Sequence, residues 1–143
     1  MENILKYENS RELYQFLIDQ YQFFLKEKSH DKNTDNFYIV LVGNFFLIRY
    51  YTDRRFLSAD IASLNDQQTW YDVSFMKDLI HNPDAINTID IEDNKTRIER
   101  INNFLQSDYN KICELMTDAN YPNTKNQLEE GLRKQFRKAH KNN

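Results

Sequence analysis

Residues 37–52 read Phe-Tyr-Ile-Val-Leu-Val, then Gly43-Asn44, then Phe-Phe-Leu-Ile-Arg-Tyr-Tyr-Thr, and this stretch decides the fold. Two apolar runs rich in β-branched and aromatic residues, separated by a glycine-containing dipeptide, are typical of a β-hairpin. Gly43 at the first turn position predicts a type II′ turn in which Val42 faces Phe45. Both faces of such a hairpin are apolar near the turn, whereas a surface hairpin has one polar face. The second face is therefore expected either to lie under the chain's own helices or to contact a partner.

The two faces of the hairpin differ in their expected roles. One face is predicted to be the core side, and it consists of Phe37, Ile39, Leu41, Phe46, Ile48 and Tyr50. The opposite side consists of Tyr38, Val40, Val42, Phe45, Leu47 and Arg49. The second set is the side for which both alternatives stay open, cover by the chain's own helices or contact with a partner.

The flanking segments predict helices and one more strand. Apolar residues recur at helical spacing over 10–28, which predicts a first helix. A turn at 53–55 precedes an alternating stretch over 56–62, which predicts a third strand. Asp72 is the expected N-cap of a short helix that ends at Pro83. A short extended piece is expected at 86–91, then a long helix from Asp93 or Asn94 to Met116, and a last helix containing Leu128, Leu132 and Phe136.

These elements predict a single α+β domain over residues 1–143. Its order is an N-terminal helix, a three-stranded antiparallel meander, and three helices packed on the sheet. The chain has 143 residues with only two Gly and two Pro, which indicates a compact fold rich in regular structure.

Charge, cysteine content and hydropathy indicate the expected cellular compartment and the charge of a partner. A lone Cys113 cannot form an internal disulfide, and the N-terminus has no signal-peptide pattern. No segment approaches the roughly 20 apolar residues that span a bilayer, so we expect a cytoplasmic protein. The net charge of −3 is uneven, with −1 over residues 1–52, −5 over 53–99 and +3 over 100–143. The acidic middle could attract a basic partner.

No residue pattern predicts catalysis or a cofactor. The histidines, His30, His81 and His140, lie far apart in the sequence, so no metal site is expected. Cys113 lies in a helical apolar pattern, where a thiol behaves as a small hydrophobe. Neither glycine belongs to a phosphate-binding fingerprint. Asp90, Glu92 and Asp93 form an acidic cluster, which we interpret as helix capping in preference to acid–base chemistry. The prediction is a protein that is not an enzyme and has no cofactor.

One set of short segments resembles small bacterial immunity-type proteins of polymorphic toxin systems. The segments are Asp53-Arg54-Arg55, Asp60-Ile61-Ala62, Trp70-Tyr71-Asp72-Val73 and Leu79-Ile80, about a fifth of the chain. The resemblance implies a protein that neutralises a toxin by covering its active site, with no chemistry of its own.

Two functions follow as hypotheses. The first is a non-catalytic protein-binding module, with a basic toxin as one partner, whose contact surface is predicted to include Tyr38, Arg49, Tyr51, Asp60, Asp66, Trp70, Tyr71 and Asp72. The second is a nucleic-acid-associated protein that uses the basic C-terminal segment 133–141. A homodimer formed through the exposed hairpin face is a further alternative.

Overall fold

A computed structural model describes residues 6–81 and 93–141, with side chains as far as residue 137. A 3-10 turn (Tyr7–Asn9) precedes helix α1 (Arg11–Tyr21). Five strands follow, β1 (Phe24–His30), β2 (Phe37–Val42), β3 (Phe46–Asp53), β4 (Phe56–Ser63) and β5 (Asp66–Asp72). The remaining elements are helices α2 (Val73–His81), α3 (Asn94–Ser107), α4 (Tyr109–Leu115) and α5 (Tyr121–Lys141).

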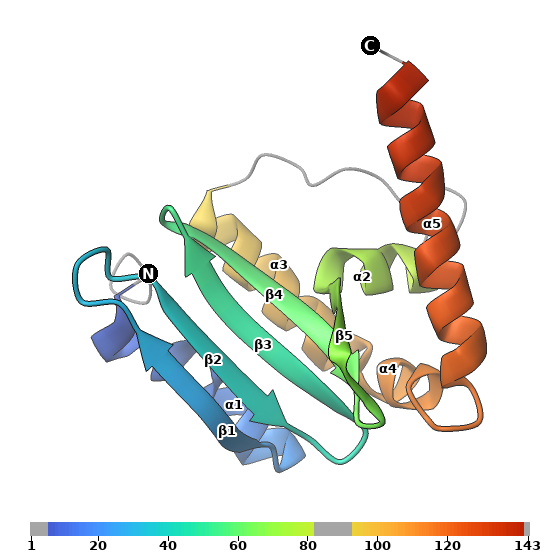
Figure 1. Cartoon of the computed structure of the whole chain (residues 1–143). Coiled ribbons are helices and arrows are strands. Elements are labelled where there is room, and N and C mark those ends of the chain that lie inside the picture. The colour runs from blue at the N-terminus through green and yellow to red at the C-terminus, as the bar shows by residue number, and fades with distance from the viewer. Residues whose placement is uncertain (1–5, 82–92, 142–143) are drawn as a thin grey trace.

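The strands form one antiparallel sheet in the order β1-β2-β3-β4-β5, and each strand pairs with its neighbours in sequence. Helices α1, α3 and α4 lie behind this sheet in Figure 1, and α5 runs beside β5. The α+β class is as predicted, but the three-stranded meander was wrong, because the sheet has five strands. Both extra strands are edge strands.

Strand β1 replaces the second half of the expected first helix. Helix α1 ends at Tyr21 because Gln22 adopts a left-handed conformation (φ 60°), and the Phe23 amide donates to the Leu17 carbonyl. This is a helix-terminating geometry that glycine usually provides. Phe24 then pairs with Val42, so the residues after Phe23 that were predicted to continue the first helix belong to the sheet.

Strand β5 occupies a polar segment in which no strand was predicted. Gln67 and Gln68 are exposed, and β5 pairs with β4 alone. An edge strand with exposed side chains has no apolar alternation, so the sequence carries little strand signal there. The predicted third strand is β4, and its apolar residues Leu57, Ala59 and Ile61 are buried.

The hairpin register differs from the prediction by two residues. Val42 pairs with Leu47, and the Gly43 amide donates to the Phe46 carbonyl at 2.9 Å, so Asn44 and Phe45 form the loop. A shift of two residues leaves every side chain on its predicted face. The predicted core side is accordingly buried, with Phe37, Ile39, Leu41, Phe46, Ile48 and Tyr50 all in the main core.

Gly43 is required for packing and not for a turn conformation, since no glycine of the described chain has a positive φ. A Cβ atom at this position would lie 2.5 Å from Cζ of Phe23, a ring that is itself buried against Phe46. Gly43→Ala is therefore expected to lower the free energy of unfolding by roughly 1–3 kcal/mol. Chemical denaturation measures this, with the exposed Asn44→Ala as the neighbouring control. Equal unfolding midpoints for the two variants would contradict this role of Gly43.

The helices that follow the sheet match the prediction except in one place. Asp93 caps α3 by accepting from the Thr96 amide, and Asp72 accepts from the Ser74 amide at the start of α2. The expected long helix is divided at Asp108 into α3 and α4. The predicted extended piece at 86–91 lies outside the described residues.

The main core lies between the sheet and the helices. Tyr50 is buried there, and its hydroxyl donates to Oδ1 of Asn102, whose amide nitrogen donates to the Leu13 carbonyl. This chain of hydrogen bonds joins β3, α3 and α1, and burial raises the pKa of Tyr50. None of the helices in the described ranges is long and apolar enough to cross a lipid bilayer.

Candidate binding face of the sheet

The side of the sheet that faces away from the helices is the candidate functional surface, and we call it the open face. In Figure 1 this side of β1–β4 faces the viewer, and no labelled helix crosses it. Strand alternation and pairing assign residues to it. They are Phe24, Glu27, Ser29, Tyr38, Val40, Val42, Leu47, Arg49, Tyr51, Asp53, Phe56, Ser58, Asp60, Ala62, Trp70 and Asp72.

The sheet curls so that the open face is concave. Lys26 of β1 donates to Oε1 of Gln67 of β5 at 2.9 Å, although these strands are the two edges of the sheet. In a flat sheet the two edges would lie about 19 Å apart, too far for this contact. A second, smaller core forms in the concavity, where Leu47 and Ala62 are fully buried although no helix covers them.

Arg49 lies at the centre of this face. Its guanidinium is 4.4 Å from the ring centre of Trp70, 5.3 Å from that of Tyr51 and 5.7 Å from that of Tyr38. Contacts within about 6 Å of a ring centre are favourable cation–π interactions. One arginine therefore holds together aromatic side chains from three strands, β2, β3 and β5.

Asp60 fixes the position of Arg49. The two residues are directly paired across β3 and β4, and both Nε and Nη2 of Arg49 donate to Oδ2 of Asp60, the Nε contact at 3.1 Å. Burial raises the pKa of Asp60, and the guanidinium opposes this rise. Asp72, paired with Asp60 on the other side, raises the pKa of Asp60 as well. The ion pair is thus the arrangement that allows a charged carboxylate to stay in this site.

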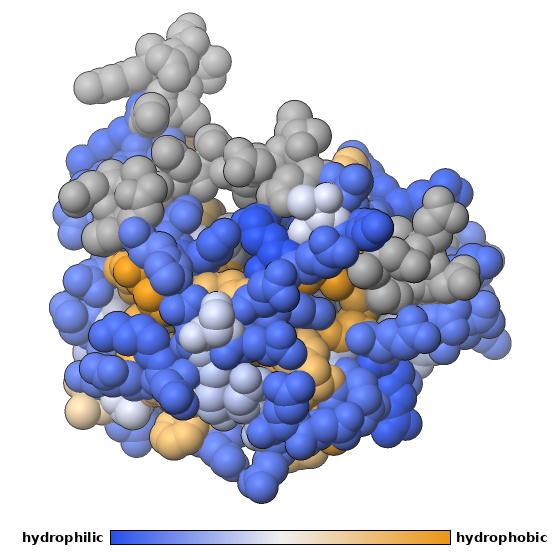
Figure 2. Space-filling view, turned by 180° about the vertical axis from the view of Figure 1, so that it is seen from behind, coloured by the Kyte–Doolittle hydropathy of each residue, from blue (hydrophilic) through white to orange (hydrophobic). Residues whose placement is uncertain are grey.

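Exposed aromatic residues lie at two ends of the open face. Phe24 is 60% exposed and Phe56 is 59% exposed, and each belongs to an edge or an end of the sheet. Between them Tyr38, Tyr51 and Trp70 are half-buried. The helix-covered side presents mostly hydrophilic residues, with apolar residues in smaller patches (Figure 2).

The open face is also acidic. Its strand positions carry four carboxylates, Glu27, Asp53, Asp60 and Asp72, against the guanidinium of Arg49 and the ammonium of Lys26, which reaches across the concavity to Gln67. Two copies of this face would repel each other, whereas a basic surface would be attracted.

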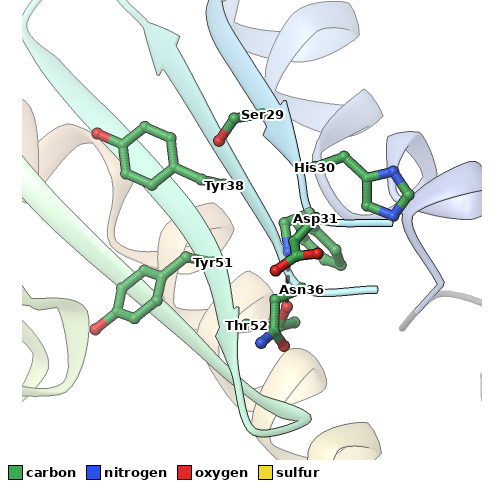
Figure 3. Close-up of a pocket in the computed structure, with 8 residues that line it drawn as sticks. Ser29, His30, Asp31, Asn36, Tyr38, Tyr51 and Thr52 are labelled. Atoms are coloured by element: carbon green, nitrogen blue, oxygen red, sulfur yellow. Dashed lines mark hydrogen bonds between the residues drawn. The ribbon is translucent and has the colours of Figure 1, made fainter. Parts of the chain in front are cut away.

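A shallow depression lies at the end of the open face where β1, β2 and β3 meet the 31–36 loop. Its volume is about 430 Å³, and it is lined by Ser29, His30, Asp31, Asn36, Phe37, Tyr38, Tyr51 and Thr52. Tyr38 and Tyr51 project side by side from adjacent strands, and Asp31, Asn36 and Thr52 lie together at the strand ends (Figure 3). The two tyrosines connect this depression to the Arg49 cluster.

Six of the eight residues predicted for partner binding lie on the open face. They are Tyr38, Arg49, Tyr51, Asp60, Trp70 and Asp72.

The other two predicted residues serve the contact between β5 and α5. The hydroxyl of Tyr71 is 2.9 Å from Glu129, and Asp66 accepts from Tyr121 and Lys125. Tyr71 points away from the open face because neighbours along a strand alternate sides. The hydrogen bonds from Tyr121 and Lys125 lower the pKa of Asp66.

Sequence reasoning missed Phe24, Glu27, Asp53 and Phe56 as members of this surface. Phe24 and Glu27 were assigned to a helix, so no sequence pattern placed their side chains on a face of the sheet. Strand alternation could have placed Phe56 and Asp53 on the open face, because Phe56 lies two residues from Ser58 and Asp53 lies two residues from Tyr51.

The described side chains show no constellation for metal binding. No group of three or more His, Cys, Asp or Glu side chains converges in the part of the chain that the structure describes. His30 pairs with Asp35 and His81 with Asp108, while the side chain of His140 lies outside the described part. Cys113 is buried, and burial raises the pKa of its thiol.

Comparison with known proteins finds no match among protein-family models, curated proteins or solved structures.

Proposed function

We propose that this chain is a non-catalytic protein-binding module that binds a protein with a basic surface on its open face. The observation that carries the proposal is the Arg49 cluster, in which a tryptophan, two tyrosines and an arginine are held together on a side of the sheet that no helix covers. Trp, Tyr and Arg are the residue types that contribute most to protein–protein binding energy.

The charge of the open face selects the class of partner. Four carboxylates against two cations, Arg49 and Lys26, leave the open face with a net negative charge, which favours a basic surface and disfavours a second copy of the same face. The resemblance of the sequence to immunity-type proteins adds a specific candidate, a basic toxin whose active surface would be covered. Association should then slow as ionic strength rises.

A capture experiment with matched variants tests the proposal. Tagged full-length chain is used to capture bound species from the native cell at low salt, and protein is separated from nucleic acid. We expect a stoichiometric basic protein that is lost with Phe24→Ala/Phe56→Ala and with Trp70→Ala, and retained with Phe136→Ala. Phe136 is 64% exposed on α5, away from the sheet, so its replacement controls for loss of an exposed aromatic ring.

Three results would contradict the proposal. Retention of the partner by the Phe24→Ala/Phe56→Ala variant would place the interface elsewhere, and both residues are exposed enough for the fold to tolerate alanine. Nucleic acid as the sole bound species would favour the basic C-terminal helix instead. A dimer-sized species without another protein would favour self-association.

A further inference from the structure

We infer that the depression at the end of the open face receives an arginine side chain of the bound protein. This inference rests on the proposed function and names the group that the site recognises. The depression is formed by β1, β2, β3 and the 31–36 loop, with a volume of about 430 Å³, enough for one large side chain.

The aromatic wall of the depression suits a guanidinium. Tyr38 and Tyr51 are directly paired on β2 and β3 and project side by side (Figure 3). The same two rings already lie within 5.7 Å of the guanidinium of Arg49. A planar guanidinium stacks on aromatic rings, whereas an ammonium is more strongly hydrated. The rings therefore favour arginine over lysine.

The polar part of the depression is anionic. Asp31 lines it, and the amide of Asn33 donates to its carboxylate at 2.9 Å. This hydrogen bond lowers the pKa of Asp31, so the carboxylate is ionised at neutral pH. Ser29 and Asn36 add neutral hydrogen-bonding groups to the lining.

The nearby cation Arg49 adjoins the depression without lining it, since its guanidinium lies 5.3 Å from the ring centre of Tyr51 and 5.7 Å from that of Tyr38. Among the described residues, the lining of the depression contains neither lysine nor arginine, and the histidine in it, His30, is 2.6 Å from the carboxylate of Asp35. The lining thus combines two aromatic rings, an ionised carboxylate and neutral polar groups. This combination is complementary to a cation and would repel an acidic side chain.

A titration with arginine amide tests the site without the natural partner. In ¹⁵N-labelled full-length protein we expect the amide signals of Ser29, Tyr38 and Tyr51 to shift saturably, with a Kd of roughly 1–10 mM. Citrulline amide has nearly the same shape and the same α-amino group but carries a neutral urea in place of the guanidinium, and it should produce no saturable shift. Equal shifts with the two ligands, or none with either, would overturn the arginine site.

Two isosteric variants provide the matched control. Asp31→Asn removes the carboxylate while its side-chain carbonyl can still accept from the Asn33 amide. Asp19→Asn changes the net charge equally on α1, outside the lining, and its side-chain carbonyl can still accept from the Gln15 amide. We expect Asp31→Asn to raise the Kd for arginine amide roughly tenfold, and Asp19→Asn to leave it nearly unchanged. An equal change in both variants would indicate general electrostatic attraction and overturn the site.

The same variants separate this inference from the proposed function. With the captured protein, Asp31→Asn should weaken binding and Asp19→Asn should not. If both bind like wild type while Phe24→Ala/Phe56→Ala abolishes binding, the arginine site fails and the open-face interface stands. If none of these variants changes binding, both proposals fail.

Discussion

Replacing Arg49 with methionine is expected to lower the free energy of unfolding at neutral pH by about 3–5 kcal/mol. Asp60 is only 5% exposed, and Arg49 donates both of the side-chain hydrogen bonds that the structure describes for it. Removal of the guanidinium therefore leaves a buried carboxylate without its counter-charge. Urea denaturation followed by circular dichroism measures the loss.

The Arg49→Met variant should also show a distinctive pH dependence. Burial already raises the pKa of Asp60, and the opposing effect of Arg49 is gone in the variant. A carboxyl group whose pKa is higher in the folded than in the unfolded state binds more protons when folded. The destabilisation should therefore be fully present above the folded-state pKa and diminish as the pH falls toward about 4.

A double variant isolates the charge effect from lost packing. Arg49→Met with Asp60→Asn removes both charges, and it should recover at least half of the stability that Arg49→Met loses. If Arg49→Met were as stable as wild type at pH 7, or if the double variant recovered nothing, the ion pair would not have the role assigned to it.

Phe46→Ala is the second substitution with a large expected effect, and it should lower the free energy of unfolding by about 3–5 kcal/mol. Phe46 is fully buried, with its ring centre 5.4 Å from that of Phe23 and 5.8 Å from that of Tyr109. Its truncation leaves a cavity between β3, α4 and the segment after α1. Thermal and chemical unfolding report the loss.

Phe45 provides the matched control for Phe46. It is the preceding residue, it is the same amino acid, and it is 43% exposed in the hairpin loop. Phe45→Ala should change stability by less than about 1 kcal/mol. Similar losses for both variants would mean that the hairpin has a different register from the one described.

The sequence predicted the buried side of the sheet well because its signal is local. Alternation over 37–52 and 56–62 identifies which side chains share a face, and a register error of two residues leaves that assignment intact. The same alternation placed Tyr38 and Arg49 on the opposite side. Helix caps at Asp72 and Asp93 were predictable for the same reason, since capping depends on residues three positions apart or fewer.

The edge strands could not be predicted because their signals are tertiary. Strand β1 exists because Gln22 ends α1 in a conformation that glycine usually adopts, and because Phe24–His30 finds a partner in β2. Strand β5 has polar exposed residues, so only its pairing with β4 defines it. The curl of the sheet, which brings Lys26 to Gln67, depends on both edges.

The candidate site was only partly predictable, because some of its residues lie on the edge strand β5. Trp70 and Asp72 were chosen for residue type, but their position beside Arg49 and Asp60 arises from β5. Tyr71 was predicted on the same surface as Trp70, but alternation places its side chain on the opposite side of the strand. The acidic middle of the sequence did indicate the negative charge of the open face.

The most direct test of the open-face interface is hydroxyl-radical footprinting of the chain, free and in the complex captured at low salt. Mass spectrometry reads oxidation of each aromatic residue, with Phe136 on α5 as an internal reference. We predict that Phe24, Phe56 and Trp70 become protected in the complex while Phe136 is oxidised at the same rate as in the free chain. Protection of Phe136 with unchanged oxidation of Trp70, Phe24 and Phe56 would contradict binding through the open face.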